Sequence, residues 1–456
     1  GFGSGGALIV TAAGGDLGAG YKGHGSLTIA DGINVASPYG VLGDYAEATG
    51  SATITGTDSS WSIGDYIDVG RYGNGTIGVA AGGVVSAGSG FLGYGPEAVG
   101  MATITGSGSK WINSRDFFVG NKGRGMLNIE AGAEVSSSNI YLGYWGNSIG
   151  EVSVTGSGSK LTSSENLIVG RGGSGVLWVD GGGEVACKYA QIESVAREST
   201  VIGLGSKLTT STDLRVGYGG SGSLYVAGGG RVSSRSGYIG SFSDQTVSEV
   251  TITGPGSQWD NDFLVVGYGP KNVGGGTLNI TDGGLVTVAE SLRLDPVTPG
   301  KDGFVNISTG GMLAVFGDVA GSLTQFLGVI EGSGTIRYWL DEVGWSPISG
   351  ATQGVDYELQ HFSTGDLHGY SLLTVGTISA GPPGDFNGDT IVDGADLLRW
   401  QRGGSPDPNS ATDLAVWQTN YGAATPLPTT ADIPEPTAWI LIGLSLVGFR
   451  RFCNQM

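Results

Sequence analysis

The feature that most constrains this 456-residue chain is an internal repeat of roughly 50 residues. The segment ITGTDSSW, which ends at Trp61, returns as ITGSGSKW ending at Trp111. Each repeat has two similar halves of roughly 25 residues, each marked by an apolar residue followed by glycine. Such a period is typical of solenoids, in which each unit buries its apolar face against the next. The apolar-glycine steps begin at Val69, Leu92, Val119, Leu142, Val169, Ile192, Val216, Ile239 and Val266.

Each half contains three short apolar segments separated by glycine-rich corners. In one half, Leu127 and Ile129 alternate with polar neighbours, which is the pattern of a strand with one buried face. Three strands per rung of about 25 residues predict an all-β fold, a right-handed parallel β-helix over residues 1–316. A β-propeller has a similar repeat length, but its blades need antiparallel hairpins, a pattern that the repeats do not show.

Composition and aromatic spacing agree with a packed repeat fold. Glycine accounts for 89 of 456 residues, and the absence of a G-X-Y period argues against collagen. Tryptophan recurs at one repeat position, where Leu161 and Leu208 stand in other copies. We therefore expect Trp61, Trp111 and Trp259 to pack in the core or at its edge rather than to bind a ligand.

Charge and cysteine content exclude several classes of protein. The net charge is −19 and basic residues are not clustered, so nucleic acid is not an expected partner. Only Cys187 and Cys453 are present, so no disulfide framework stabilises the fold. Because Gly1 already lies inside a repeat, we expect the N-terminus to be truncated, so the lack of a signal peptide does not indicate a cytoplasmic location.

The repeat also resembles a known type. The pattern VGxxGxGxLxIxxGGxVxS, followed by LGxxxxxxGxxTITGxGSxW, is seen from Val69 to Trp111 and again from Val119. It resembles the repeat of autotransporter passengers and of proteins with a Pro-Glu-Pro C-terminal sorting signal. The resemblance implies a secreted, β-helical surface protein and no particular enzyme activity.

Residues 317–380 lose the repeat but keep strand-like stretches, TIRYWL and YSLLTVG. An open end of a β-helix exposes unpaired strand edges that recruit other chains. We therefore expect this segment to be a β-rich cap on the β-helix.

The segment GDFNGDTIVDGADLLRW predicts a calcium site in a small α-helical module over residues 381–425. Oxygen ligands at loop positions 1, 3, 5, 9 and 12, with a backbone carbonyl at position 7, surround a hard cation. The side-chain ligands would be Asp385, Asn387, Asp389, Asp393 and Asp396, and the carbonyl that of Ile391.

This segment resembles a type I dockerin repeat, which implies calcium as cofactor and a cohesin-like protein as a candidate partner. Thr390 replaces the usual glycine at position 6, which weakens the expected affinity. A second copy, Thr412 to Gly422, keeps the helix pattern without the ligand loop, so one site is expected. Calcium could serve only to fold the helix pair, or the module could also dock to a partner.

After a linker at 426–433, residues 434–456 form an apolar tail with a motif at each end. The apolar run is short for a span of about 20 residues, yet the arginines after it obey the positive-inside rule. The tail resembles the Pro-Glu-Pro signal that an exosortase-type membrane peptidase processes in Gram-negative bacteria that make extracellular polysaccharide. This implies export and a cell-surface or extracellular location, with at least transient membrane anchoring through a hydrophobic helix. The motif residues are Pro434, Glu435, Pro436, Arg450 and Arg451.

Residues suited to catalysis are few. The histidines are His24, His361 and His368, and their spacing suggests no Ser-His-Asp set. An acidic residue precedes alternate apolar-glycine steps, but a regular series has no unique centre. We predict a turn or surface role for these acids, with weak calcium binding as the next alternative. They are Asp65, Asp116, Glu165, Asp213 and Asp262.

A tyrosine column follows the apolar-glycine steps at Tyr94, Tyr144, Tyr218 and Tyr268. Exposed rings could stack on sugars, and packing of one turn on the next explains the column equally well.

The leading hypothesis is a non-catalytic secreted structural or adhesion protein of the cell surface or extracellular matrix. Its expected partners are the exosortase-type peptidase and extracellular polysaccharide or the cell envelope. One alternative is a β-helical glycoside hydrolase or polysaccharide lyase with a dockerin-like module. Another is a scaffold component that docks to a cohesin-like partner.

Overall fold

The structure is a computed structural model that describes residues 9–11, 15–193, 198–240, 247–267, 275–295, 303–340, 343–376, 383–386, 391–401 and 410–423. The chain divides into two compact units, Gly1–Ile378 and Ser379–Met456. Several predicted residues lie outside the described part. They are Asn387, Asp389, Tyr268, Cys453 and the motif residues of the 434–456 tail.

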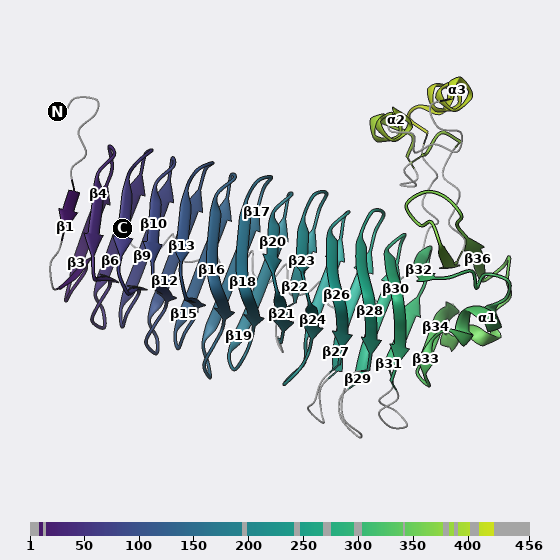
Figure 1. Ribbon diagram of the computed structural model, residues 1–456, viewed down its shortest axis with the longest axis horizontal. Helices are drawn as coiled ribbons and strands as arrows, with labels where there is room; N and C mark the ends of the chain where they lie inside the picture. The colour runs from purple at the N-terminus through teal and green to yellow at the C-terminus, as the bar shows by residue number, and fades with distance from the viewer. Residues whose placement is uncertain are drawn as a thin grey trace, which may run out of the picture. The chain divides into compact units, whose positions relative to one another are not determined.

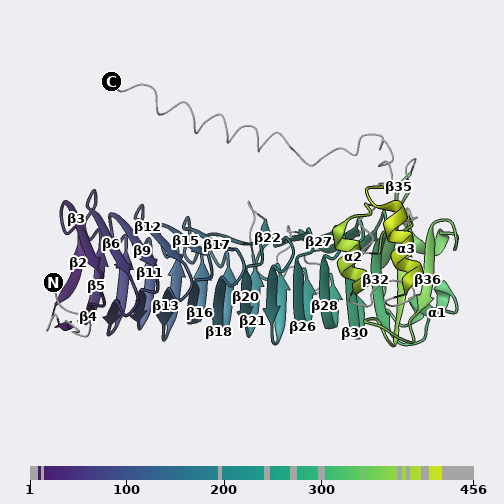
Figure 2. The ribbon, with the colours of Figure 1, turned by 90° about the horizontal axis from the view of Figure 1, so that it is seen from above.

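The first unit is an all-β solenoid of about 11 turns, which confirms the predicted parallel β-helix repeat. Strands of successive turns lie side by side along this unit (Figure 1 and Figure 2). A typical turn contributes β6 (Thr49–Thr55) to one sheet, and β7 (Ser60–Ile63) and β8 (Tyr66–Val69) to the other.

Within the described residues, the first sheet has 14 strands. Its strands are β3 (His24–Ile29), β6, β9 (Asn74–Ala80), β12 (Val99–Thr105), β15 (Arg124–Glu130), β17 (Ile149–Thr155), β19 (Ser174–Asp180), β22 (Ser199–Ile202), β25 (Ser223–Ala227), β27 (Val247–Thr253), β29 (Gly275–Thr281), β31 (Gly303–Ile307), β34 (Thr335–Leu340) and β35 (Gly344–Pro347).

The second sheet has 23 strands in the part of the chain that the structure describes. Its strands are β1 (Ile9–Thr11), β2 (Asp16–Ala19), β4 (Asn34–Ser37), β5 (Tyr39–Leu42), β7, β8, β10 (Val84–Ala87), β11 (Ser89–Leu92), β13 (Lys110–Asn113), β14 (Asp116–Val119), β16 (Glu134–Leu142), β18 (Lys160–Val169), β20 (Glu184–Cys187), β21 (Tyr189–Ile192), β23 (Lys207–Thr210), β24 (Asp213–Val216), β26 (Arg231–Ile239), β28 (Gln258–Val266), β30 (Leu285–Leu294), β32 (Gly311–Phe316), β33 (Glu331–Gly332), β36 (Tyr357–His361) and β37 (Tyr370–Val375).

Equivalent residues of successive turns face one another, so apolar side chains form continuous rows inside the solenoid. Ile104 of β12 pairs with Val79 of β9 and with Ile129 of β15, and all three are fully buried. The alternation at Leu127 and Ile129 therefore marks a core-facing strand, as predicted.

Not every turn has three separate strands. In β16 and β18 a single strand passes through the second corner, with a register irregularity between Ser137 and Asn139. In the early turns this corner carries Pro38 or Gly64, and proline removes a backbone donor from the strand. At this corner of β16, the Ser137 hydroxyl donates to the carbonyl oxygen of Arg115 at 2.7 Å, which ties the corner to the preceding turn.

The recurrent tryptophans belong to the core. Trp61, Trp111 and Trp259 have no exposed surface, and each indole N–H is satisfied inside the solenoid. Trp61 donates to Ser37 Oγ at 3.0 Å, and Trp111 to Asn113 Oδ1 at 2.9 Å. The interpretation of this column as core packing is confirmed.

The motif GxGSxW forms a hydrogen-bonded corner. Gly106 and Gly108 have φ values of +88° and +84°, a backbone region that favours glycine. Ser109 is buried, and its Oγ accepts the backbone N–H of Gly82, one turn earlier, at 3.0 Å. Four other serines make the same bond at 3.0 Å: Ser59 with Gly32, Ser159 with Gly132, Ser206 with Gly182 and Ser257 with Gly229.

Antiparallel pairs replace the parallel pattern after the last full turn. Strand β37 pairs with β32 and β36, and β35 pairs with β34. Helix α1 (Leu323–Gly328) buries Phe326 against the core that the solenoid rows form. Residues 317–376 thus share one core with the solenoid.

The second unit contains α2 (Gly394–Gln401) and α3 (Ala411–Asn420). The Trp400 indole donates to the carbonyl oxygen of Ser410, which precedes α3, at 2.9 Å. In the described part of the chain, no helix has both the length and the apolar character needed to span a bilayer.

We expect the Ser109→Ala variant to lose about 1–2 kcal/mol of unfolding free energy, because the Gly82 N–H loses its partner. Urea-induced unfolding measured by tryptophan fluorescence tests this. Ser107→Ala, an exposed position of the same corner, is the matched control and should change little. Equal stability of the two variants would contradict the role assigned to the corner serine.

Candidate functional site

Aromatic side chains form a ladder on the outer face of the 23-stranded sheet. Phe91 of β11 and Phe118 of β14 stack with ring centroids 5.0 Å apart and planes 2° apart. Tyr141 of β16 continues the ladder at 4.9 Å. Because parallel strands place equivalent residues side by side, the ladder follows the stacking direction of the turns.

The predicted tyrosine column packs against this ladder. Tyr94 meets Phe91 edge to face at 5.4 Å, and Tyr144 meets Phe118 in the same way at 5.0 Å. The guanidinium of Arg215 lies 5.2 Å from the ring centre of Tyr218. Tyr144 therefore packs against the preceding turn, and Tyr94 and Tyr218 contact side chains of their own turn. Tyr268 lies outside the described residues.

Three further exposed rings lie at positions that the sequence pattern did not predict. Tyr45, Tyr72 and Trp145 are 45%, 51% and 55% exposed, and each lies two positions after the glycine of an apolar-glycine step. Tyr72 contacts Tyr94 edge to face at 6.1 Å, and Trp145 contacts Tyr144 at 5.1 Å. We use the name aromatic ridge for Tyr21, Tyr45, Tyr72, Tyr94, Tyr144 and Trp145.

Lysine and arginine side chains lie over the ridge. Lys22 Nζ lies 5.1 Å from the ring centre of Tyr45, and the Arg171 guanidinium lies 5.0 Å from that of Tyr144. Rings with adjacent cationic donors can stack on a sugar and bind its hydroxyl groups.

Four of the five repeat acids have side-chain partners in other turns or in their own strand. Asp65 pairs with Arg115, and Glu165 pairs with Lys188 at 2.8 Å. Asp116 accepts from Asn139 Nδ2 at 2.9 Å. Asp213 pairs with Arg215 at 3.0 Å. These contacts support the surface role assigned to the series.

One carboxylate that the sequence did not single out is buried. The Asp68 side chain is 2% exposed, and Arg71 Nε lies 3.3 Å from its Oδ2. The same guanidinium reaches Asp44 at 3.3 Å and Asp16 at 3.6 Å, so one cation serves three acids from three turns. Burial raises the pKa of Asp68 to about 7, although Arg71 acts in the opposite direction.

The surroundings of His361 do not match a Ser-His-Asp triad. His361 Nδ1 lies 3.4 Å from Ser371 Oγ and 3.9 Å from Asp318, so one ring nitrogen faces both residues. A triad needs the acid on one ring nitrogen and the nucleophile on the other. Ser371 is fully buried and donates to the carbonyl oxygen of Gly317 at 2.6 Å, which fits a structural bond.

The described part of the predicted calcium loop brings its two ends together. Asp396 is fully buried at the start of α2, and its carboxylate accepts the N–H groups of Phe386 and Asp393 at 2.7 and 2.8 Å. The Trp417 indole of α3 donates to the carbonyl oxygen of Asp393 at 2.7 Å. These bonds hold Asp396 inside the loop, where a ligand at position 12 would have to lie.

The described residues include only some of the predicted calcium ligands. Among the described residues, no three His, Cys, Asp or Glu side chains form a group that could hold a metal. The predicted ligands Asp385, Ile391, Asp393 and Asp396 are described, whereas Asn387 and Asp389 are not. Calcium therefore stays a prediction supported by the loop closure and the oxygen donors.

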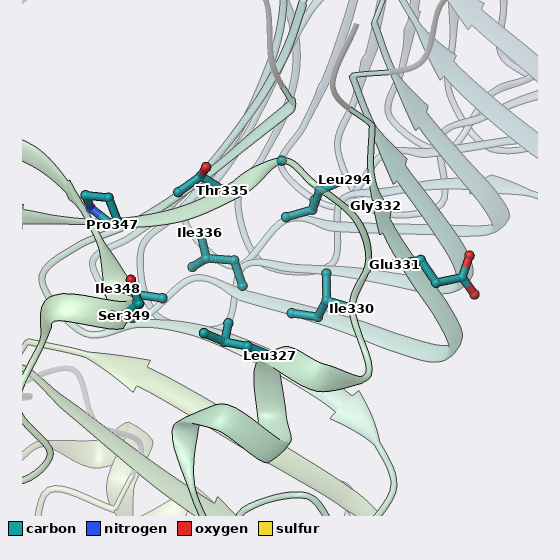
Figure 3. A pocket seen from close by; sticks show the side chains of 11 residues that line it. Leu294, Leu327, Ile330, Glu331, Gly332, Thr335, Ile336, Pro347, Ile348 and Ser349 are labelled. Atoms are coloured by element: carbon teal, nitrogen blue, oxygen red, sulfur yellow. The ribbon is translucent and has the colours of Figure 1, made fainter. Parts of the chain in front are cut away.

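A cavity of about 210 Å³ lies near α1 and the antiparallel strands (Figure 3). Leu327, Ile330 and Ile336 line it, and the Glu331 carboxylate points away from these three side chains. Pockets that enclose small molecules have volumes of about 300–1,000 Å³, so this space is small for a ligand.

No family model, no curated protein and no solved structure matches this chain.

We expect stability to fall as pH rises from 5 to 8, because of Asp68. The folded state holds this proton up to pH about 7, whereas an unfolded aspartate releases it near pH 4. Between these values the folded state binds more protons, so each pH unit costs about 1.4 kcal/mol. Asp68→Asn should remove most of this dependence and be more stable than wild type at pH 8.

Urea midpoints at pH 5 and pH 8 measure the effect. Asp65→Asn is the control because Asp65 has a side chain that is 47% exposed, and it should keep the wild-type dependence. A pH dependence unchanged in Asp68→Asn would contradict the assignment.

Proposed function

We propose that this chain is a non-catalytic structural and adhesion protein of the cell surface or extracellular matrix. The observation that carries the proposal is the aromatic ridge, which follows an otherwise regular solenoid and leaves Tyr45, Tyr72 and Trp145 exposed. A row of exposed rings on a regular solenoid suits repeated weak contacts with a polymer. The proposed partner is extracellular polysaccharide or the cell envelope.

The regular charge pairing supports a structural role. Asp65, Glu165 and Asp213 each engage a cation rather than facing a second carboxylate. Glycosidases need two carboxyl groups placed across a scissile bond. The proposed rod thus acts by presenting surface rather than by cleaving its ligand.

Export and sorting are proposed from the tail sequence. Pro434, Glu435 and Pro436 precede an apolar run that ends before Arg450 and Arg451. An exosortase-type peptidase would process this signal, leaving the protein at the cell surface or in the matrix after transient anchoring. We also propose that the solenoid is right-handed.

The second unit is proposed to bind one calcium ion. Exposed apolar side chains on it also favour a second candidate function, docking to a cohesin-like partner. Ile391, Leu398 and Tyr421 are 46%, 51% and 62% exposed. A soluble module with such side chains has apolar surface available to a protein partner.

We expect the full chain to co-sediment with insoluble extracellular polysaccharide from a Gram-negative biofilm. The double variant Tyr72→Ala with Trp145→Ala should reduce the bound fraction several-fold, because two exposed rings are removed from the aromatic ridge. Tyr421→Ala, an exposed tyrosine of the second unit, is the control. New reducing ends or unsaturated products during incubation would reject the non-catalytic assignment.

Calcium titration of the full chain by calorimetry should show one binding event. Asp389→Ala and Asp393→Ala each remove an oxygen ligand, so affinity should fall at least tenfold, about 1.4 kcal/mol. Asp413→Ala, in the first turn of α3, should leave the titration unchanged. An unaltered titration in the two loop variants would refute the ligand assignment.

A further inference from the structure

A shallow groove lies on the outer face of the 14-stranded sheet, across β15, β17 and β19. Its volume is about 130 Å³. The side chains that form it are those of Met126, Asn128, Glu151, Ser153, Val176 and Trp178.

Strand register arranges these side chains in two rows. Asn128 pairs with Ser153, and Ser153 with Trp178, so these three form one row across three adjacent strands. Met126, Glu151 and Val176 form the second row, two residues earlier in each strand. Residues two apart share a face of a strand, so both rows face outward together.

Trp178 interrupts the repeat. The equivalent positions of the preceding turns hold Thr53, Gly78, Thr103, Asn128 and Ser153, all small or polar. Trp178 is 47% exposed although it is the largest side chain of this row. A departure from a repeated pattern distinguishes this part of the face, which the regular series of repeat acids does not do.

The groove offers the two kinds of contact that a pyranose ring needs. The exposed indole of Trp178 can stack on the apolar C–H face of the ring. The amide of Asn128, the hydroxyl of Ser153 and the carboxylate of Glu151 can bind its hydroxyl groups.

The size of the groove favours a polymer over a free sugar. Its volume of about 130 Å³ is below the range of about 300–1,000 Å³ typical of pockets that enclose a ligand. The row continues past Trp178 through Thr200 of β22 to Tyr225 of β25. Two strand spacings, about 10 Å, separate the two aromatic residues, close to the length of a disaccharide in an extended β-linked chain.

The charge of this face disfavours an anionic polymer. Glu151, Glu198 and Glu249 lie along it, and Arg124 pairs with Glu151 at 3.5 Å. Glu198 accepts from Ser223 at 2.7 Å. Burial and nearby Glu249 raise the pKa of Glu198, as expected where carboxylates are close together. Three acids against one base would repel uronate or sulfate groups.

We propose that this face is a binding site for an uncharged β-linked polysaccharide that runs along the solenoid, with sugar rings stacked on Trp178 and Tyr225. This inference rests on the proposed function for the class of ligand, a polysaccharide. Its residues lie on the 14-stranded sheet and are separate from those of the aromatic ridge.

Calorimetric titration of the full chain with cellohexaose, glucose and hexagalacturonate tests the proposal. Cellohexaose should bind, glucose should bind at least tenfold more weakly, and hexagalacturonate should not compete. Trp178→Ala should lower cellohexaose affinity about tenfold or more, whereas Trp178→Phe should retain part of it. Trp339→Ala, with an equally exposed tryptophan of the same sheet outside the groove, is the matched control.

The outcomes separate this inference from the proposed function. Cellohexaose binding that is unchanged in Trp178→Ala, or preferential binding of hexagalacturonate, overturns the inference. Absence of cellohexaose binding while the chain still co-sediments with extracellular polysaccharide through the aromatic ridge also overturns it and leaves the proposed function intact. Binding that is lost in Trp178→Ala and kept in the Tyr72→Ala, Trp145→Ala variant supports it.

Discussion

Parallel backbone pairing between each strand and its copy in the next turn is the constraint on which the solenoid depends. It satisfies the backbone N–H and C=O groups of one turn with those of the next, and it aligns equivalent side chains in rows. Ile104 lies between Val79 and Ile129 only because that register is kept. The hydrogen bond from the Gly82 N–H to Ser109 Oγ fixes the same register at the corner, where the chain leaves the sheet. A residue that suits one turn therefore suits all of them, which explains why the sequence repeats.

The same constraint separates inward from outward positions. An inward side chain must fill the space between the equivalent side chains of the turns before and after it. An outward side chain need only avoid steric clash with its equivalents in those turns. Outward rows can therefore hold structural pairs, as where Lys110 meets Glu134 at 2.9 Å. They can also hold exceptions such as Trp178, whose removal would leave the core rows unchanged. Binding surfaces can thus change on this fold without altering the packing that holds it together.

Much of the fold could be predicted because core rows follow simple rules. The alternation at Leu127 and Ile129 and the recurrence of Trp111 report burial directly, and both predictions are confirmed. The exposed rings Tyr72 and Trp145 were missed because an outward position obeys no packing rule. Asp68 was missed because YIDV reads as an ordinary strand. Arg71 follows it by three residues, but only the register brings Asp16 and Asp44 from other turns to the same guanidinium.

The two aromatic surfaces differ in a way that follows from ring geometry. Phe91 and Phe118 stack face to face, so each covers a face that a sugar would need, and only the rings beside them stay open. Trp178 has Ser153 and Thr200 as its row neighbours, so the strands on either side of it carry only small side chains in that row. A ladder of stacked rings therefore stiffens one sheet, while a lone indole among small polar residues leaves its surface to a ligand. The isolated indole therefore suits specific recognition of a ligand, whereas the open rings beside the ladder suit multivalent, less selective adhesion.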